Sequence, residues 1–405
     1  MLGRRRTRLT REGWYYLLVL AFVVTGAMLR EINLLMMMAG LLIGPLLLNW
    51  RLAVASLRPL VASRRLASTV GVGEALSVEI TVHSGKGWLP WFSTGGWAVT
   101  VEDEIRRVGA GSSATPLRSG VLFWHIARGK AQRVAYRGRL LRRGHYEFGP
   151  LTVSTRFPLG LVRRWMVVDA PQELIVLPRL GQLTPAWRAF CRRSLHADRG
   201  RRTQQAAPEG DFHSLREWRP GDARRQIHWR TTARRRTPVV RRLERPQNAD
   251  VAVLLDLSTR RLDGDGEDPV TERAIGFVAT VISDLCRQGV GWMLLGTAAE
   301  THQVFRGPTS AGLLRECMLH LATLESGKED AIQPLLVEVL GNLRRDTRVV
   351  VVTTRGKSAG AGSAELTQGW MGAGGRPIEP ALVIHAGSSE LDEFYRGEEH
   401  SGSQP

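Results

Sequence analysis

Two long apolar runs near the start of the chain constrain its fold more than any other feature. From Trp14 to Leu29 every side chain is apolar or small except two tyrosines and a threonine, and from Ile32 to Leu48 the only polar side chain is Asn33. As a helix rising about 1.5 Å per residue, each run spans roughly 25 Å, close to the hydrocarbon thickness of a bilayer. The sequence therefore predicts two transmembrane helices, at about residues 14–30 and 32–49, in a membrane anchor formed by residues 1–62.

Arginines flank this hairpin on one side only. Five arginines lie between residues 4 and 11 and four more between residues 51 and 65, whereas the turn between the runs carries only Arg30 beside Glu31. Under the positive-inside rule, we predict a multi-pass protein of the cell membrane with both termini cytoplasmic. The alternative, a cleaved signal peptide, would explain a basic start before one apolar run, but here a second run follows at once.

The cysteines and the net charge indicate which bonds and partners this chain can have. Cys191, Cys286 and Cys317 are far apart and show no CxxC spacing, which predicts reduced thiols rather than disulfides or zinc ligands. The formal net charge is +18, and arginine supplies nearly all of the positive groups. This excess suits a surface that faces anionic membrane lipid.

Between residues 63 and 170 the pattern changes to short strands. Residues 75–82 alternate in side-chain type with period two, as a half-buried strand does. Several short strands within about a hundred residues, without a long helical pattern, predict a small β-sandwich. Residues 171–207 are expected to form a connector that contains one strand-like run, 174–177.

From about Asp250 strands alternate with helices. Residues 251–255 are an apolar run that ends at Asp256, which is typical of a buried parallel strand, and residues 269–288 have a helical apolar face. The alternation predicts an α/β doubly wound sheet in a domain at 208–390, with a disordered tail at 391–405. Further elements are expected at residues 291–295, 310–324, 332–343, 348–352 and 381–384.

The segment from Gly210 to Arg234, which we call the signature segment, is the most distinctive part of the chain. Its Pro-Gly pair at residues 220–221 predicts a turn, and Asp222 is placed to cap a helix that begins at Ala223. Because a planar guanidinium pairs well with carboxylates, we expect a buried or half-buried network of Arg216, Arg225 and Arg234 with Glu217, Asp222 and Glu244. The alternative is a solvent-exposed basic face. The residues that we single out are Arg216, Trp218, Gly221, Asp222, Arg225, His228, Trp229 and Arg234.

In this order, the signature segment resembles the DUF58 family, bacterial and archaeal membrane proteins with a von Willebrand factor A-like domain. The match includes Leu215–Trp218, Pro220–Asp222 and Ile227–Trp229, followed by the strand that ends at Asp256. The resemblance implies a von Willebrand factor A-like fold for the C-terminal domain. It also implies a partner, a MoxR-type AAA+ ATPase, with which such proteins are thought to assemble or remodel protein complexes.

The same resemblance raises the question of a divalent metal. In that fold an Asp-x-Ser-x-Ser loop holds the cation together with a later threonine and aspartate, which are the hard oxygen ligands that Mg²⁺ prefers. Here Asp256 and Ser258 fill the first two positions, but Arg260 stands at the third, and the later strand ends in Thr353-Thr354-Arg355. We therefore expect no metal and no cofactor, with Asp256 accepting hydrogen bonds from backbone amides instead.

The sequence gives little support to an enzyme. Asp211, His213, Asp222 and His228 could form an acid–base cluster, but all four lie in the signature segment, where each has a structural role available. No GxSxG, HExxH or phosphate-binding loop occurs. We predict a non-enzymatic, membrane-anchored scaffold for protein–protein interaction. The alternative is a membrane-associated nucleic-acid-binding protein in which Trp218 and Trp229 stack on bases. Because both tryptophans lie in the signature segment, we expect them to pack against the protein instead.

Overall fold

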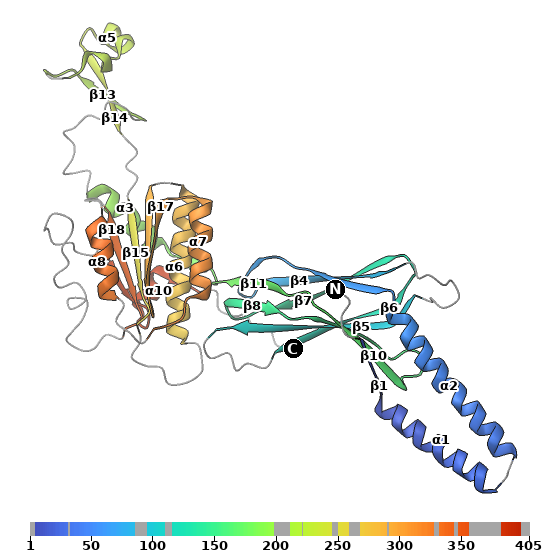
Figure 1. Cartoon of the computed structure of the whole chain (residues 1–405). Helices are drawn as coiled ribbons and strands as arrows, with labels where there is room; N and C mark the ends of the chain where they lie inside the picture. The colour runs from blue at the N-terminus through green and yellow to red at the C-terminus, as the bar shows by residue number, and fades with distance from the viewer. Residues whose placement is uncertain are drawn as a thin grey trace. The chain divides into compact units, whose positions relative to one another are not determined.

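The computed structural model divides the chain into two compact units, Met1–Leu177 and Pro178–Pro405, which we describe separately (Figure 1). The elements of each unit are given below with their bounds. The structure describes residues 5–30, 33–85, 95–109, 116–197, 211–220, 222–244, 250–258, 268–289, 291–327, 332–343, 347–355 and 382–397.

The first unit begins with strand β1 (Arg5–Leu9) and the helices α1 (Arg11–Arg30) and α2 (Asn33–Leu57). Both helices are long and apolar enough to cross a membrane, as the two apolar runs predict. The Tyr16 hydroxyl of α1 donates to the Leu42 carbonyl of α2 at 2.8 Å. Two details differ from the sequence-based expectation: α2 continues well beyond residue 49, and the arginine-rich segment before α1 is a strand.

Two β-sheets pack face to face in the rest of this unit, as expected for a β-sandwich. One has the order β1-β10-β9-β5-β8-β11-β3 with β6 on β5, and the other has the order β2-β4-β7. The strands are β2 (Leu60–Arg65), β3 (Thr69–Gly71), β4 (Ala75–Ser84), β5 (Gly96–Val108), β6 (Leu117–Ile126), β7 (Ala131–Arg139), β8 (Gly144–Phe148), β9 (Leu151–Thr155), β10 (Val162–Val168) and β11 (Gln172–Leu177).

The sandwich extends further in sequence than predicted. Strand β11, which the sequence places in a connector, pairs antiparallel with β8 and parallel with β3, so it belongs to the larger sheet. At the other end of the chain, β1 pairs antiparallel with β10 from Arg5↔Met166 to Leu9↔Val162. Both edges of the sandwich domain therefore lie outside the predicted range of 63–170.

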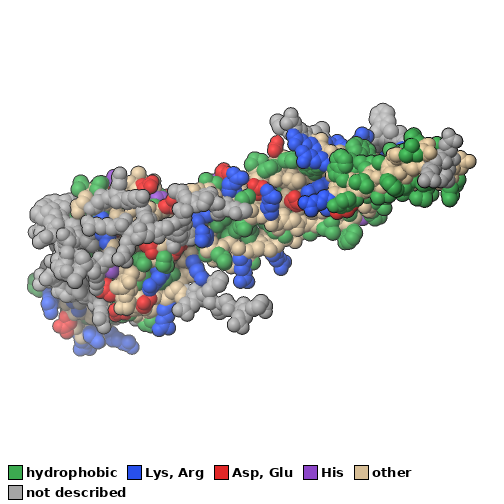
Figure 2. All heavy atoms as spheres, turned by 90° about the horizontal axis from the view of Figure 1, so that it is seen from below, with side chains coloured by type: hydrophobic (Ala, Val, Ile, Leu, Met, Phe, Trp, Pro, Cys, Tyr) green, Lys and Arg blue, Asp and Glu red, His purple; other side chains and the backbone are tan. Residues whose placement is uncertain are grey.

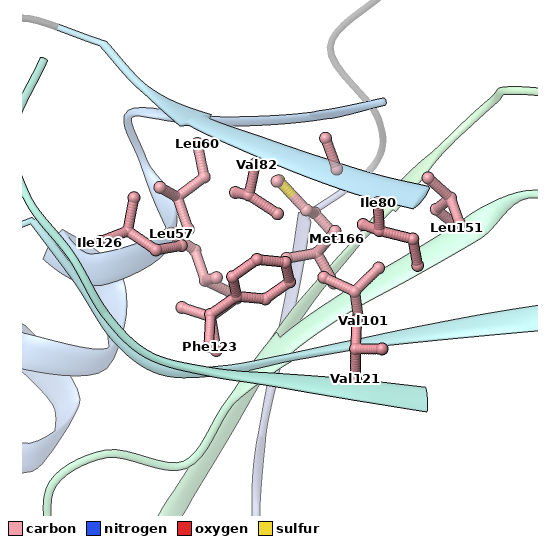
Figure 3. Packing of buried hydrophobic residues seen from close by; sticks show 13 residues of the cluster. Leu57, Leu60, Ile80, Val82, Val101, Val121, Phe123, Ile126, Leu151 and Met166 are labelled. Carbon is pink, nitrogen blue, oxygen red and sulfur yellow. The ribbon is translucent and has the colours of Figure 1, made fainter. Parts of the chain in front are cut away.

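The core between the sheets includes the end of helix α2. Leu57 and Phe123 are fully buried in one cluster, together with apolar residues of β2, β4, β5, β9 and β10 (Figure 3). Along α2, the buried residues Asn49, Ala53, Ser56 and Leu57 recur at helical spacing. The last two turns of α2 thus pack as part of the sandwich, and burial of their apolar surface fixes the helix to the sheets.

A buried charge joins the two sheets. The Arg64 side chain of β2 has no exposed surface and pairs with Asp103 of β5, whose side chain is equally buried. Tyr136 of β7 donates to the second oxygen of Asp103 at 2.7 Å. Arg64 also donates to the Gln172 side chain at 3.1 Å and lies over the Phe148 ring at 4.8 Å. Burial raises the pKa of Asp103, which Tyr136 and Arg64 oppose by hydrogen bonds and charge.

A short loop at residues 156–161, which we call the junction loop, contacts the start of α1 and the part of α2 that follows its apolar run. Asn49 of α2 donates to the Phe157 carbonyl at 3.1 Å and accepts from the Leu161 amide at 3.0 Å. Thr10, just before α1, donates its hydroxyl to the Gly160 carbonyl at 2.7 Å. Gly13 packs so closely that a Cβ there would lie 2.1 Å from the Leu161 carbonyl oxygen.

The second unit contains a five-stranded mixed sheet with the order β17-β16-β15-β18-β19, parallel except for β17. Helix α8 packs its apolar side on β15, β16 and β18, and α6 packs against β15 and β18 in a separate layer (Figure 1). The predicted strands and helices from residue 251 onward are confirmed, and one strand, β17, was not predicted. The bounds are β15 (Val251–Asp256), α6 (Pro269–Gln288), β16 (Trp292–Ala298), β17 (His302–Pro308), α7 (Ala311–Thr323), α8 (Ile332–Asn342), β18 (Arg348–Thr353) and β19 (Leu382–His385).

Four further elements occur where the sequence predicts a connector or a disordered tail. They are β12 (Gln182–Leu183), α3 (Pro185–Ala197), α10 (Glu390–Phe394) and β20 (Tyr395–Arg396). β12 pairs antiparallel with β20, and Trp187 of α3 is buried against Phe277 and Phe394. The prediction of disorder from residue 391 is wrong for this part, because Leu391 and Tyr395 are buried.

The Arg64–Asp103 pair generates a stability prediction. We expect Arg64→Met to lower the free energy of opening of the sandwich by roughly 3–5 kcal/mol, because it leaves a buried carboxylate without its cation. The double variant with Asp103→Leu should recover much of this loss. The measurement is hydrogen exchange of sandwich amides in the detergent-solubilised chain.

The matched control is Arg118→Met, which removes an exposed partner of Glu104 at 3.6 Å. This change should cost less than about 1 kcal/mol. Equal effects of the Arg64 and Arg118 variants would contradict a structural role for the buried pair.

Candidate functional site

The signature segment folds into a small hairpin module. Strand β13 (Asp211–Glu217) pairs antiparallel with β14 (Val239–Glu244), and between them lie a short 3₁₀ helix, η2 (Arg224–Gln226), and helix α5 (Trp229–Arg235). An isolated bridge joins Ile227 to Val240. Where the structure describes burial in the module, at residues 215–220 and 222–241, Val239 and Val240 alone are buried. Local hydrogen bonds define the turn between the two strands.

Asp222 organises the turn of the module. Its carboxylate accepts two hydrogen bonds from the Arg216 guanidinium, at 2.7 and 2.6 Å, in a bidentate arrangement. It also accepts from the Arg219 amide at 2.8 Å, while the Trp218 indole donates to the Asp222 carbonyl at 3.3 Å. The predicted ion-pairing of Arg216 is confirmed. The predicted helix cap is wrong, because these partners engage the Asp222 side chain and the following residues form only η2.

His228 has the capping role that the sequence assigns to Asp222. It is the N-cap of α5, and its Nδ1 accepts from the Thr231 amide at 3.2 Å. Its own amide donates to the Val239 carbonyl at 2.8 Å. The predicted continuous helix from Ala223 is therefore broken at Ile227 and His228, whose backbones are not helical. These contacts give His228 a structural role in the module.

Three signature residues have no such structural role. Trp229 is 68% exposed, and Arg225 and Arg234 are exposed, with no ion pair to any described residue. The buried or half-buried pairing predicted for Arg225 and Arg234 is therefore wrong. The expectation that Trp229 packs is wrong here, and Trp218 is also exposed, at 37%. Gly221 lies outside the described residues. The module thus holds its shape with Arg216, Asp222 and His228 and leaves an aromatic ring and cations at its surface.

This division of roles predicts a pH dependence. The pKa of Asp222 lies below its ordinary value of 3.8, chiefly because Arg216 donates hydrogen bonds to the carboxylate and secondarily because the Arg219 amide does. A lowered folded-state pKa means that the stabilisation is complete above about pH 4 and is lost as pH falls through the folded-state pKa. Protection of the amides of residues 216–222, taken relative to the intrinsic exchange rate at each pH, should fall at that acid limit, and Asp222→Asn should remove this protection at neutral pH. Unchanged exchange in Asp222→Asn would contradict the assigned role.

A second polar cluster lies at the carboxyl ends of β15 and β18. Ligand sites of parallel sheets form at this edge, where neighbouring connections leave in opposite directions. Asp256 is fully buried and accepts from the Ser258 amide at 3.1 Å, from the Thr353 hydroxyl at 3.0 Å and from Arg355 Nε at 2.8 Å. The expectation that Asp256 accepts from a backbone amide is confirmed, but the guanidinium partner was not foreseen.

These contacts do not fit a divalent cation. Both Asp256 oxygens already accept hydrogen bonds, and Arg355 supplies the neutralising positive charge. Ser258 Oγ and His385 Nε2 are buried nearby in the fold without a hydrogen-bond partner among the described residues. Arg260, at the third ligand position of the sequence pattern, lies outside those residues. In the part of the chain that the structure describes, no group of three or more His, Cys, Asp or Glu side chains is placed to hold a metal.

The Asp256–Arg355 pair can be tested by removing its cation. We expect Arg355→Ala to destabilise the sheet by about 2–3 kcal/mol, less than a fully buried pair because the Arg355 side chain is 32% exposed. Thermal unfolding of the detergent-solubilised chain measures this loss. Added Mg²⁺ should leave the unfolding midpoint of the native chain unchanged.

The control for this test is Arg273→Ala, which removes the exposed partner of Asp392. That change should cost less than about 1 kcal/mol. A midpoint of the native chain that rises with Mg²⁺ would contradict the guanidinium assignment.

Comparison with known families supports the DUF58 resemblance. Residues 214–355, from the hairpin module to the end of β18, match the family described as "Protein of unknown function DUF58". A protein of Bacillus subtilis (strain 168), "Uncharacterized protein YeaD", is 22% identical over 315 residues, which cover 74% of this chain and 72% of that protein.

Likenesses to solved structures are limited. The CARDB domain of the PF1109 protein from Pyrococcus furiosus is 15% identical and covers 29% of this chain and 91% of that domain, with a TM-score of 0.19. A superoxide reductase (neelaredoxin) from Ignicoccus hospitalis is 14% identical and covers 28% of this chain and 79% of that protein, also with a TM-score of 0.19. Likenesses of this size carry no argument about fold or function.

Proposed function

We propose that this chain is a non-enzymatic scaffold, anchored in the cell membrane by α1 and α2, that binds a partner protein through its hairpin module. The observation that carries the proposal is the division of roles within the module. Arg216, Asp222 and His228 hold its shape, whereas Arg225, Trp229 and Arg234 remain at its surface. Side chains of these two types dominate the energetics of protein interfaces.

The small size of the module supports this proposal. A two-stranded hairpin with few buried side chains is marginally stable in water, so its exposed apolar and aromatic groups gain most from being covered. The module exposes three large apolar side chains: Trp229 is 68% exposed, and Trp218 and Leu215 are each 37% exposed. Arginine keeps its charge, stacks on flat groups and donates several hydrogen bonds, which suits a surface that binds carboxylates.

The partner that we propose is a MoxR-type AAA+ ATPase. Support comes from the DUF58 match, which covers the module and most of the sheet. The sheet order, with helices in two layers and polar residues at the carboxyl ends of β15 and β18, supports a von Willebrand factor A-like, doubly wound domain. We propose that the Asp256–Arg355 pair takes the place of a metal in this domain, so that recognition relies on the module.

Affinity capture tests the proposal. The full chain, cross-linked in its own cells and extracted in detergent, should enrich an AAA+ ATPase. Purified binding measurements should then show at least a tenfold loss of affinity, about 1.4 kcal/mol, for Trp229→Ala and for Arg225→Ala. The matched control is Trp124→Ala in the sandwich, because Trp124 is 73% exposed and lies outside the module. Its binding should equal that of the native chain.

The alternative of nucleic-acid binding predicts different results. Exposed Trp229 with nearby arginines would also suit stacking on single-stranded bases. Binding of an oligonucleotide with a steep dependence on salt concentration, lost in Trp229→Ala, would favour that alternative. Absence of any ATPase among cross-linked proteins, with the module intact by amide exchange, would contradict the proposed partner.

A further inference from the structure

The junction loop lies at the level where the apolar part of the helical hairpin ends. The apolar run of α2 ends at Leu48, and the next residue, Asn49, donates to the Phe157 carbonyl and accepts from the Leu161 amide. On the other helix, Thr10 and Gly13 contact the same loop directly before the apolar run that starts at Trp14. The loop is therefore fixed beside the bases of both helices by its own backbone.

Aromatic and apolar side chains gather at this level. Trp14 and Trp50, at the bases of the helices, are 65% and 48% exposed, and Leu159 at the tip of the loop is 52% exposed. Trp97 stacks on Phe157 with ring centroids 5.4 Å apart and remains 37% exposed. Tryptophan is enriched where hydrocarbon meets headgroups, because its ring is apolar and its N–H donates a hydrogen bond.

The charges at this level are predominantly positive. Arg11, Arg51 and Arg156 are exposed, and both Arg11 and Arg156 lie close enough to Glu12 to act on its carboxylate electrostatically. Glu12 offsets one of the three positive charges. Figure 2 shows lysine and arginine side chains gathered beside the hydrophobic helical end.

We propose that the junction loop and the adjoining tryptophans and arginines form a lipid-binding collar that rests in the headgroup layer of an anionic bilayer. The collar comprises Arg11, Trp14, Trp50, Arg51, Trp97, Arg156 and Leu159. It rests on the proposed membrane insertion of α1 and α2 and adds a second contact with the lipid. Leu159 and the tryptophans enter the headgroup layer, and the arginines bind lipid phosphates with charge-assisted hydrogen bonds.

Geometry favours a bilayer surface over a soluble partner for the collar. The headgroup region adds roughly 5–8 Å to each side of the hydrocarbon core, so groups beside the end of the apolar runs lie within it. Each additional arginine near an anionic surface contributes about 1 kcal/mol, and the collar supplies three, of which Glu12 offsets one.

Site-specific quenching in vesicles tests the collar. The full chain, with Cys191→Ser and Cys286→Ser and with buried Cys317 retained, receives one fluorophore at Leu159→Cys, Leu141→Cys or Phe22→Cys. Leu141 is the matched control, because it is 59% exposed and lies at the end of the small sheet away from the helices. It follows β7, whose last residue pairs with Ala75 at the start of β4, whereas Ser84 at the other end of β4 pairs with Leu60, close to α2. Vesicles contain phosphatidylcholine, with or without phosphatidylglycerol, and carry nitroxides on headgroups or on acyl chains.

We expect headgroup nitroxides to quench the label at 159 several-fold more than the label at 141. Phosphatidylglycerol should increase quenching at 159, and Arg11→Gln/Arg156→Gln should abolish that increase. The control variant Arg137→Gln/Arg139→Gln changes two exposed arginines of β7 and should leave that increase unchanged.

Each contrary result has a distinct meaning. Quenching of Phe22 by acyl-chain nitroxides without quenching of 159 by headgroup nitroxides would overturn the collar and leave the membrane span intact. Quenching at 159 that does not increase with phosphatidylglycerol would overturn the specificity of the collar for anionic lipid. An unquenched label at Phe22 would overturn the membrane span itself, and with it the collar that depends on the span.

Discussion

The Arg64 guanidinium lies between the two sheets of the sandwich with no exposed surface, so protein groups must satisfy all of its donors. The guanidinium donates to the side chains of Asp103 and Gln172 and to the carbonyls of Phe148, Gly149 and Ala170. These groups lie in β5, β8 and β11 or directly beside these strands, which are distant in sequence from Arg64. The sheets can therefore pack together only in the arrangement that assembles this whole set, because a partly satisfied buried cation is costly.

The same constraint determines where the helices attach. Strand β2, which carries Arg64, begins three residues after α2 ends, and Leu57 of α2 lies in the sandwich core. With β2 held by Arg64, α2 meets the sheets in one place, where Asn49 engages the junction loop. The anchor and the sandwich thus form a single packed unit.

Local patterns predicted the elements whose signal is periodic. The apolar runs of α1 and α2 and the strands and helices from Val251 onward were found because burial imposes a simple repeat. Strand β1 escaped prediction because its sequence, Arg5-Arg6-Thr7-Arg8-Leu9, contains a single apolar residue and so shows no apolar alternation, and because its partner β10 lies more than 150 residues away. The extension of α2 had a signal, since Asn49, Ala53, Ser56 and Leu57 follow helical spacing, but their small or polar side chains concealed it.

For the candidate sites too, the sequence indicated local features, and tertiary structure determined the partners. Sequence identified Asp222 and Asp256 as important carboxylates and placed the cationic partner of Asp222 among several arginines of the signature segment. Structure selects Arg216 across the turn, and it gives Asp256 a partner that the sequence did not suggest, Arg355, from a different strand end. Guanidinium groups reach far, and the choice among many arginines depends on the tertiary fold.

Helix α2 passes from its apolar run into the sandwich core without a break. Pro45 is the one proline in its interior and lies before the junction, so the turns from Asn49 to Leu57 cross it as regular helix. A continuous helix has no hinge there. If the hairpin inserts as proposed, a change in its tilt, such as a change in bilayer thickness produces, must rotate the sandwich by the same angle. The orientation of the sandwich would then change with the thickness of the surrounding bilayer.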